Sequence, residues 1–133
     1  MKTRMRLLSL LLLSYTLFTG AATAVRSQPE ENVAADLAAG AWLVYRHHFL
    51  TEEGRVVDNR AGGISHSESQ GYGMLMAEAA ADRDSFDRIW QWTKANLLVR
   101  EDGLAAWRWD PTQMPPITDR NNATDGDLLI AWA

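Results

Sequence analysis

Two segments of the sequence, Ser67-Glu68-Ser69-Gln70 and Thr124-Asp125-Gly126-Asp127, share one pattern and decide the fold that we predict. Each begins with a hydroxyl residue that favours a helix N-terminus, and each stands directly before an apolar run. In a capping box this hydroxyl accepts a hydrogen bond from the backbone N–H three residues on. In return, the side chain of that fourth residue accepts the backbone N–H of the first. Glu68 and Asp125 are not needed for such caps, and we expect each at the first position of its helix.

Apolar periodicity predicts four helices, over residues 32–49, 67–81, 84–97 and from 124 onward. The second and fourth are apolar on most sides, which is typical of buried helices. The first and third each carry one apolar stripe, and the third, which Asp84 can cap, should lie on the outside. The two stripes consist of Leu37, Ala41, Trp42, Tyr45 and Phe49 in the first helix and of Phe86, Ile89, Trp90, Thr93 and Leu97 in the third.

The order of these helices predicts an all-α fold of repeated αα-hairpins, in which inner helices line a core and outer helices cover them. The repeat from Ser67 to Thr124 is 57 residues long. Because both inner helices point the same way, their N-termini should fall on one rim, with Glu68 and Asp125 facing the same cleft. The alternative is that both carboxylates only complement the positive ends of helix dipoles at the surface.

A long connection over residues 99–122 leads into this rim. It contains Trp107-Arg108-Trp109 and is too rich in tryptophan to be typical of disorder, so we interpret it as a functional loop. In an extended segment alternate side chains point in opposite directions. Only one of Trp107 and Trp109 should therefore face the rim.

The first 24 residues have the pattern of a secretory signal peptide. Basic residues among the first six precede an apolar stretch over residues 7–18, and small residues follow at 20–24. The stretch is shorter than the roughly 20 residues of a membrane span, which disfavours the alternative of an uncleaved anchor. We therefore expect cleavage after Ala24, a mature domain over residues 25–133, and a periplasmic or secreted location with no membrane attachment.

The composition disfavours several classes of function. The chain has a formal net charge of −4, and residues 25–133 contain 10 basic and 17 acidic residues, which disfavours binding to nucleic acid or to anionic membranes. Its sequence contains no cysteine, so it relies on no disulfides. Because its His and Asp residues lack metal-ligand spacing and it has no phosphate-binding loop, we expect neither a metal nor a cofactor.

Residues 67–74 and 123–133 resemble the two signature segments of glycoside hydrolase family 8, and a weaker resemblance extends over the helix of Trp42 and the turn at residues 54–58. Ser69 departs from the family pattern, which usually has glycine there. The resemblance implies an (α/α)6 barrel that hydrolyses internal β-1,4-glucosidic bonds of cellulose-like glucans with inversion. The likeness is strongest to periplasmic members that accompany bacterial cellulose synthase, which implies a glucan partner and an association with the synthase machinery.

By this resemblance, Glu68 is the general acid that protonates the leaving oxygen, and Asp125 lies beside the sugar at the point of cleavage. The family's water-activating base is an aspartate further downstream than this chain extends. We expect Trp107, Trp109 and Tyr72 to bind substrate, because a pyranose face can stack on an aromatic ring. We favour Trp107 as the platform, and the alternative for each tryptophan is a core role at the barrel rim.

The length of the chain sets a further expectation. Six hairpins with this repeat need roughly 300 residues, whereas residues 25–133 number 109. We therefore interpret the chain as the N-terminal third of the barrel and expect it to be inactive alone. The alternatives for function are a non-catalytic αα-toroid that binds glucan strands during export, and a family 8 enzyme that acts on xylan or chitosan.

Overall fold

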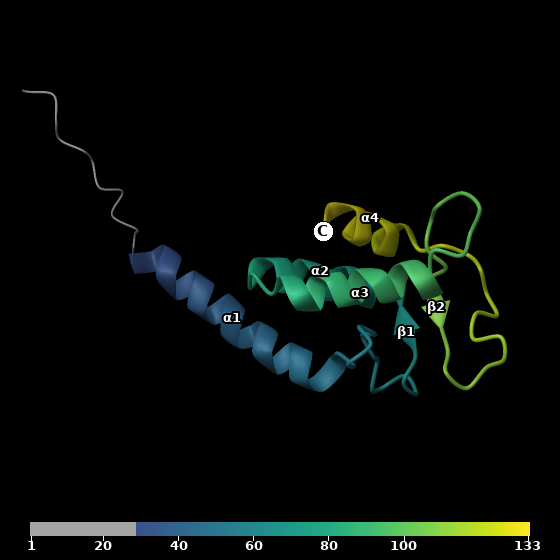
Figure 1. Ribbon diagram of the computed structural model, residues 1–133, viewed down its shortest axis with the longest axis horizontal. Helices are drawn as coiled ribbons and strands as arrows, with labels where there is room; N and C mark the ends of the chain where they lie inside the picture. Colours follow the sequence, from purple (N-terminus) through teal and green to yellow (C-terminus); the bar gives the residue numbers. More distant parts are fainter. Residues whose placement is uncertain (1–28) are drawn as a thin grey trace, which may run out of the picture.

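The computed structural model describes residues 29–133, and the predicted signal peptide lies outside them. The described residues form four helices and two short strands (Figure 1). In chain order these are α1 (Pro29–Phe49), β1 (Ser65–His66), α2 (Ser67–Ala79), α3 (Arg83–Asn96), β2 (Arg108–Trp109) and α4 (Thr124–Trp132). The four predicted helices are confirmed. No helix among residues 29–133 is long and apolar enough to cross a membrane.

α1 contacts the rest of the fold through its C-terminal half (Figure 1). Trp42 is buried in the core, and Tyr45 stacks on it with ring centroids 6.0 Å apart. Leu37 is 69% exposed, so the predicted stripe is buried only in its central part. The N-terminal half of α1 therefore adds little to the core of the described residues.

α2 and α3 form an αα-hairpin joined by a short turn at residues 80–82. The stripe predicted for the third helix is confirmed, because Ile89, Thr93 and Leu97 are fully buried. The core between the hairpin, α1 and the turn that precedes β1 consists of Trp42, Val56, Met74, Ala77 and Ile89.

The cap of α3 differs from the prediction. Asp82, not Asp84, is the N-cap, and its carboxylate accepts the N–H of Ser85 at 3.1 Å. The side chain of Asp84 lies in the first turn of the helix and is 89% exposed. Asp82 is bound at the same time by α1, through the indole N–H of Trp42 at 2.9 Å and the guanidinium of Arg46 at 2.8 Å. Tertiary contacts therefore selected the carboxylate that lies closer to the core.

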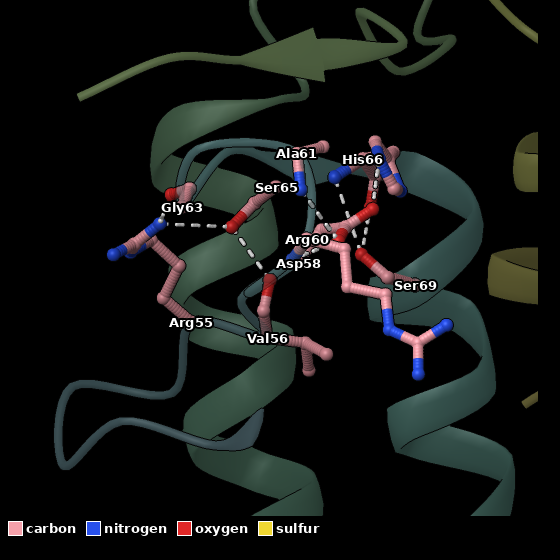
Figure 2. Close-up of polar contacts among 9 residues, drawn as sticks. All are labelled: Arg55, Val56, Asp58, Arg60, Ala61, Gly63, Ser65, His66 and Ser69. Atoms are coloured by element: carbon pink, nitrogen blue, oxygen red, sulfur yellow. Dashed lines mark hydrogen bonds and ion pairs between the residues drawn. The ribbon is translucent and has the colours of Figure 1, made fainter. Parts of the chain in front are cut away.

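Polar contacts fix the turn through which the chain enters α2 (Figure 2). The carboxylate of Asp58 accepts the backbone N–H groups of Arg60 at 2.9 Å and Ala61 at 3.0 Å. The guanidinium of Arg55 donates to the carbonyl of Gly63 at 2.7 Å. These bonds close the glycine-containing turn onto the extended segment before it.

The two helices that carry the predicted carboxylates each have their N-cap one residue earlier than we predicted. Their N-caps are His66 and Ala123. The predicted capping residues are therefore the first helical residues, and Glu68 and Asp125 occupy the second helical position, not the first. The capping boxes predicted from the sequence are wrong in both helices.

Strand pairing explains the shift at α2. β1 pairs antiparallel with β2, and the N–H of Ser67 continues this pairing by donating to the carbonyl of Trp107 at 3.0 Å. Ser69 supplies the capping bond instead. Its hydroxyl accepts the N–H of His66 at 3.2 Å (Figure 2).

The two side chains predicted to complete the capping boxes bind other segments. Gln70 is fully buried, and it accepts the N–H of Val56 at 2.6 Å and donates to the hydroxyl of Thr93 at 2.9 Å. Asp127 accepts the N–H of Ala105 at 2.9 Å. Gln70 therefore joins α2 to α3 and to the turn before β1, and Asp127 joins α4 to the long connection.

Candidate active site

The N-termini of α2 and α4 lie side by side (Figure 1). A Cβ at Gly126 would lie 2.1 Å from the hydroxyl oxygen of Ser67 and 2.9 Å from the backbone nitrogen of Glu68, so only glycine permits this approach. Further along, a Cβ at Gly71 would lie 2.5 Å from the Cβ of Leu129. Because later residues of α2 meet later residues of α4, the two helices run parallel.

This contact places Glu68 and Asp125 on one rim, as the sequence predicts. Both lie in the first turn of their helices, where the helix dipole is positive. Glu68 is half-buried and Asp125 is exposed. Within the described part of the chain the carboxyl of Glu68 forms no hydrogen bond. The carboxylate of Asp125 accepts the backbone N–H of Gly126 at 2.8 Å. Their catalytic roles stay predictions, and their placement suits a shared ligand.

The two loop tryptophans are both half-buried and contact different residues, and which of them faces a substrate stays a prediction. Trp107 is half-exposed, and its carbonyl is bonded to Ser67 at the start of α2. Trp109 packs edge-on against Trp92, with ring centroids 5.5 Å apart, and the guanidinium of Arg55 lies 5.0 Å from its ring centroid. The guanidinium of Arg108 likewise lies 5.9 Å from the ring centroid of Trp107. Because Trp109 also packs against a second aromatic ring, we still favour Trp107 as the platform for a sugar.

Tyr72, the third residue predicted to bind substrate, lies on α2 one turn after Glu68. It is 48% exposed. Residues four apart in a helix share a face, so the phenol and the carboxyl lie on the same side of α2. The position of Tyr72 suits contact with a ligand at this rim, and its role stays a prediction.

Two further residues of this region matter. The sequence predicts Ser67 only as a helix cap and predicts no role for Asp119. The hydroxyl of Ser67 is buried and has no hydrogen-bond partner within residues 29–133. Asp119 accepts the indole N–H of Trp107 at 2.9 Å. Two hydrogen bonds lower the pKa of Asp119 below its usual value. The larger effect comes from the backbone N–H of Asn121, and the smaller one comes from the indole N–H of Trp107. Its only sequence signal is that it is an aspartate in a loop. Such a residue can form an Asx turn, in which the carboxylate accepts the backbone N–H two residues on.

The chemistry of the rim is that of carboxylates and aromatic rings. Within the described residues, no group of three or more His, Cys, Asp or Glu side chains could bind a metal ion. Carboxylates beside an aromatic platform suit acid–base cleavage of a glycosidic bond, in which one carboxyl protonates the leaving oxygen.

Comparison with known proteins identifies the family. Residues 10–133 match the family described as Glycosyl hydrolases family 8. The chain belongs to this family. It is 48% identical over 96 residues to an endoglucanase of Cellulomonas uda and 51% identical over 100 residues to a probable endoglucanase of Novacetimonas hansenii. These alignments cover 72% and 75% of this chain but 27% and 29% of the two relatives.

A solved structure supports the same assignment. The family 8 chain superposes on an endo-β-1,4-glucanase of Acetobacter xylinum with a TM-score of 0.70 and 50% identity, over 73% of this chain and 30% of that one. Family 8 proteins are (α/α)6 barrels, so the predicted all-α fold class is confirmed. The α2–α3 hairpin and the parallel α4 are part of that barrel. The chain spans about three tenths of the length of these relatives.

Proposed function

We propose that this family 8 chain is part of an endo-acting β-1,4-glucanase, which cleaves cellulose-like glucans with inversion. The observation that carries the proposal is the placement of Glu68 and Asp125 at adjacent helix N-termini, with Trp107 bonded to the same rim. A protein that only binds glucan needs the aromatic platform but has no use for an unpaired carboxyl at that point. The endoglucanase names of the relatives support the substrate class.

In the proposed reaction Glu68 gives its proton to the glycosidic oxygen as the bond to the anomeric carbon breaks. Asp125, beside the same sugar, stabilises the positive charge that develops on the ring. Water attacks the opposite face, so the base that takes its proton lies roughly 6.5–9.5 Å from the acid. We assign that base to a residue that residues 29–133 do not include.

A hybrid endoglucanase tests the role of Glu68. In this hybrid, residues 29–133 replace the matching part of the Acetobacter xylinum endo-β-1,4-glucanase, which is 50% identical to this chain. Glu68→Gln retains the shape of the side chain and removes the proton, so hydrolysis of a soluble β-glucan should fall by about 100-fold to 10,000-fold. Calorimetry should show that binding of cello-oligosaccharides is nearly unchanged.

Glu78→Gln is the matched control, because Glu78 is an exposed glutamate near the other end of α2. This variant should retain the full activity of the hybrid. If Glu68→Gln instead remains within tenfold of the hybrid, Glu68 is not the acid.

The stereochemistry of the product tests inversion. Attack by water on the face opposite the leaving group must release the α-anomer first from a β-linked glucan. Proton NMR of a fresh digest by the hybrid resolves the two anomers before mutarotation equilibrates them. A β-anomer as first product would mean retention, and it would make Asp125 a covalent nucleophile.

The same hybrid separates the alternatives for substrate and function. Hydrolysis rates on β-1,4-glucan, xylan and chitosan identify the preferred polymer. A folded hybrid that binds glucan strands without cleaving any of the three would favour the non-catalytic toroid.

We also propose export and an association with cellulose synthesis. The signal pattern of residues 1–24 supports export to the periplasm or the cell exterior. A reporter enzyme that is active only after export, fused behind residues 1–28, tests this directly. Co-purification of the exported protein with cellulose synthase subunits tests the association.

A further inference from the structure

Three hydrogen bonds fix the position of Trp107. Its backbone N–H donates to the carbonyl of Asn121 at 2.8 Å, and its carbonyl accepts the N–H of Ser67 at 3.0 Å. Its indole N–H donates to a carboxylate oxygen of Asp119 at 2.9 Å. The first two bonds fix the backbone, and the third is the bond that acts on the ring itself.

Asp119 is fixed in turn by the segment that carries it. Its second carboxylate oxygen accepts the N–H of Asn121 at 2.9 Å. One carboxylate therefore bridges the indole of Trp107 and the turn that also accepts the Trp107 backbone N–H. The three residues form a closed ring of hydrogen bonds, in which the indole cannot rotate without breaking the bond to Asp119.

The charge of Asp119 strengthens this bond. The N–H groups of Asn121 and Trp107 lower the pKa of its carboxyl, so Asp119 is ionised at neutral pH. Hydrogen bonds to an ionised acceptor are roughly twice as strong as neutral ones. The guanidinium of Arg108 lies 5.9 Å from the ring centroid of Trp107, while the ring remains half-exposed.

We propose that Asp119 is a positioning residue that sets the orientation of the Trp107 indole as a platform for a pyranose ring of the glucan. The proposal rests on the proposed function, because it concerns the substrate of the same rim. A ring fixed before binding loses little side-chain entropy when a sugar stacks on it, and this preorganisation increases affinity. Asp119 touches neither the sugar nor the reacting bond in this arrangement.

Fluorine NMR of the hybrid endoglucanase, labelled with 5-fluorotryptophan, tests the positioning step without any glucanase assay. The chain contributes six tryptophans to the hybrid, and Trp107→Phe identifies the resonance of Trp107. Asp119→Ala should shift or broaden this resonance and leave those of the other five unchanged. Asp119→Asn should produce a smaller change, because the amide oxygen still accepts the bond but carries no charge.

Asp36→Asn is the control for loss of a carboxylate, because Asp36 is exposed in the N-terminal half of α1. This half of α1 points away from the loop before α4 (Figure 1). It should leave the Trp107 resonance in place. The five other tryptophan resonances report whether each variant remains folded. A Trp107 resonance that does not respond to Asp119→Ala would overturn the proposal.

Kinetics of the hybrid endoglucanase test the consequence for substrate. Asp119→Ala should raise KM for cello-oligosaccharides by about tenfold and leave kcat within about twofold. The substitution weakens binding of the ground state and the transition state equally, and it does not change the reacting groups. In a Trp107→Ala background the same substitution should have no further effect, because Asp119 acts only through the indole.

The outcomes separate this proposal from the proposed function. An equal effect of Asp119→Ala in both backgrounds, or a loss confined to kcat, would overturn the positioning role. A hybrid that cleaves no β-1,4-glucan before any substitution would overturn the proposed function, whereas the NMR result would still decide whether Asp119 orients the ring.

Discussion

At the scale of single residues, Asp82 shows how one side chain joins several elements. It caps α3 through the N–H of Ser85, and it accepts the indole N–H of Trp42 and the guanidinium of Arg46 from α1. Burial raises the pKa of Asp82, but the hydrogen bonds from Trp42, Ser85 and Arg46 outweigh it and lower the pKa to about 2. The ionised carboxylate therefore stabilises the fold.

This arrangement predicts a specific pH dependence. The folded-state pKa of about 2 lies below the ordinary value of 3.8, so the stabilisation is complete above about pH 4 and is lost as the pH falls toward 2. Asp82→Asn should lower the free energy of unfolding of the hybrid by about 1–2 kcal/mol at pH 7, since water screens the partly exposed Arg46. The difference should shrink in urea unfolding below pH 4.

Asp84→Asn is the matched control, because Asp84 is the cap that the sequence favours and its side chain is 89% exposed. This variant should change the free energy of unfolding by less than about 0.5 kcal/mol. A larger loss from Asp84→Asn than from Asp82→Asn would show that the cap assignment is wrong.

At the scale of elements, the contact between α2 and α4 brings the two carboxylates together. It depends on glycine where the helices touch, because Gly126 meets Ser67 and Gly71 meets Leu129. A glycine inside a helix normally lowers helix stability by about 1 kcal/mol relative to alanine. At these two positions the close approach of the neighbouring helix outweighs that cost.

Gly126→Ala should separate the two N-termini. The new methyl group would lie 2.1 Å from the hydroxyl oxygen of Ser67 and 2.9 Å from the Glu68 nitrogen, and the backbone nitrogen cannot move away as a flexible side chain could. Overpacking of this kind costs about 1–3 kcal/mol. Urea unfolding of the hybrid should show this loss, and its glucanase activity should fall because Asp125 moves relative to Glu68.

Gly40→Ala is the opposite case within the same chain. Gly40 is exposed in α1, and nothing lies within 4 Å of where its Cβ would be. This variant should stabilise the hybrid by about 0.5–1 kcal/mol through helix propensity alone. Equal effects of the two substitutions would mean that the α2–α4 contact is looser than the structure shows.

At the scale of the whole molecule, apolar side chains remain open on α1 and α4. Leu128 and Trp132 on α4 are 65% and 79% exposed, and Leu37 and Val44 on α1 are 69% and 61% exposed. Within residues 29–133 these surfaces have no partner that covers them. Large exposed apolar side chains of this kind favour association.

We therefore predict that residues 25–133, produced alone, associate and show no glucanase activity, because the proposed mechanism assigns the base to a residue outside them. Sedimentation equilibrium should detect dimers or larger species. Replacement of both Leu128 and Trp132 by glutamine should weaken the association without loss of helical circular dichroism. A monomeric unsubstituted sample with a sharp cooperative melt would contradict this prediction.

Much of the fold and the pairing of the site residues could be predicted from the sequence. The four helices follow from apolar periodicity, which is a local property of the chain. That only one of Trp107 and Trp109 stacks on a sugar stays a prediction from alternation in an extended segment. Glu68 and Asp125 share a rim because each lies in the first turn of its helix and the two helices run in the same direction.

Only the tertiary structure decided which groups satisfy the helix ends and which side chains orient the platform. Ser67 does not cap α2, because its N–H is bonded to the carbonyl of Trp107 and its hydroxyl is buried against Gly126. Asp119 contacts Trp107 only because the long connection folds back on itself. Periodicity is set by neighbours along the chain, whereas the partner of a hydrogen-bonding group depends on which distant segment packs beside it.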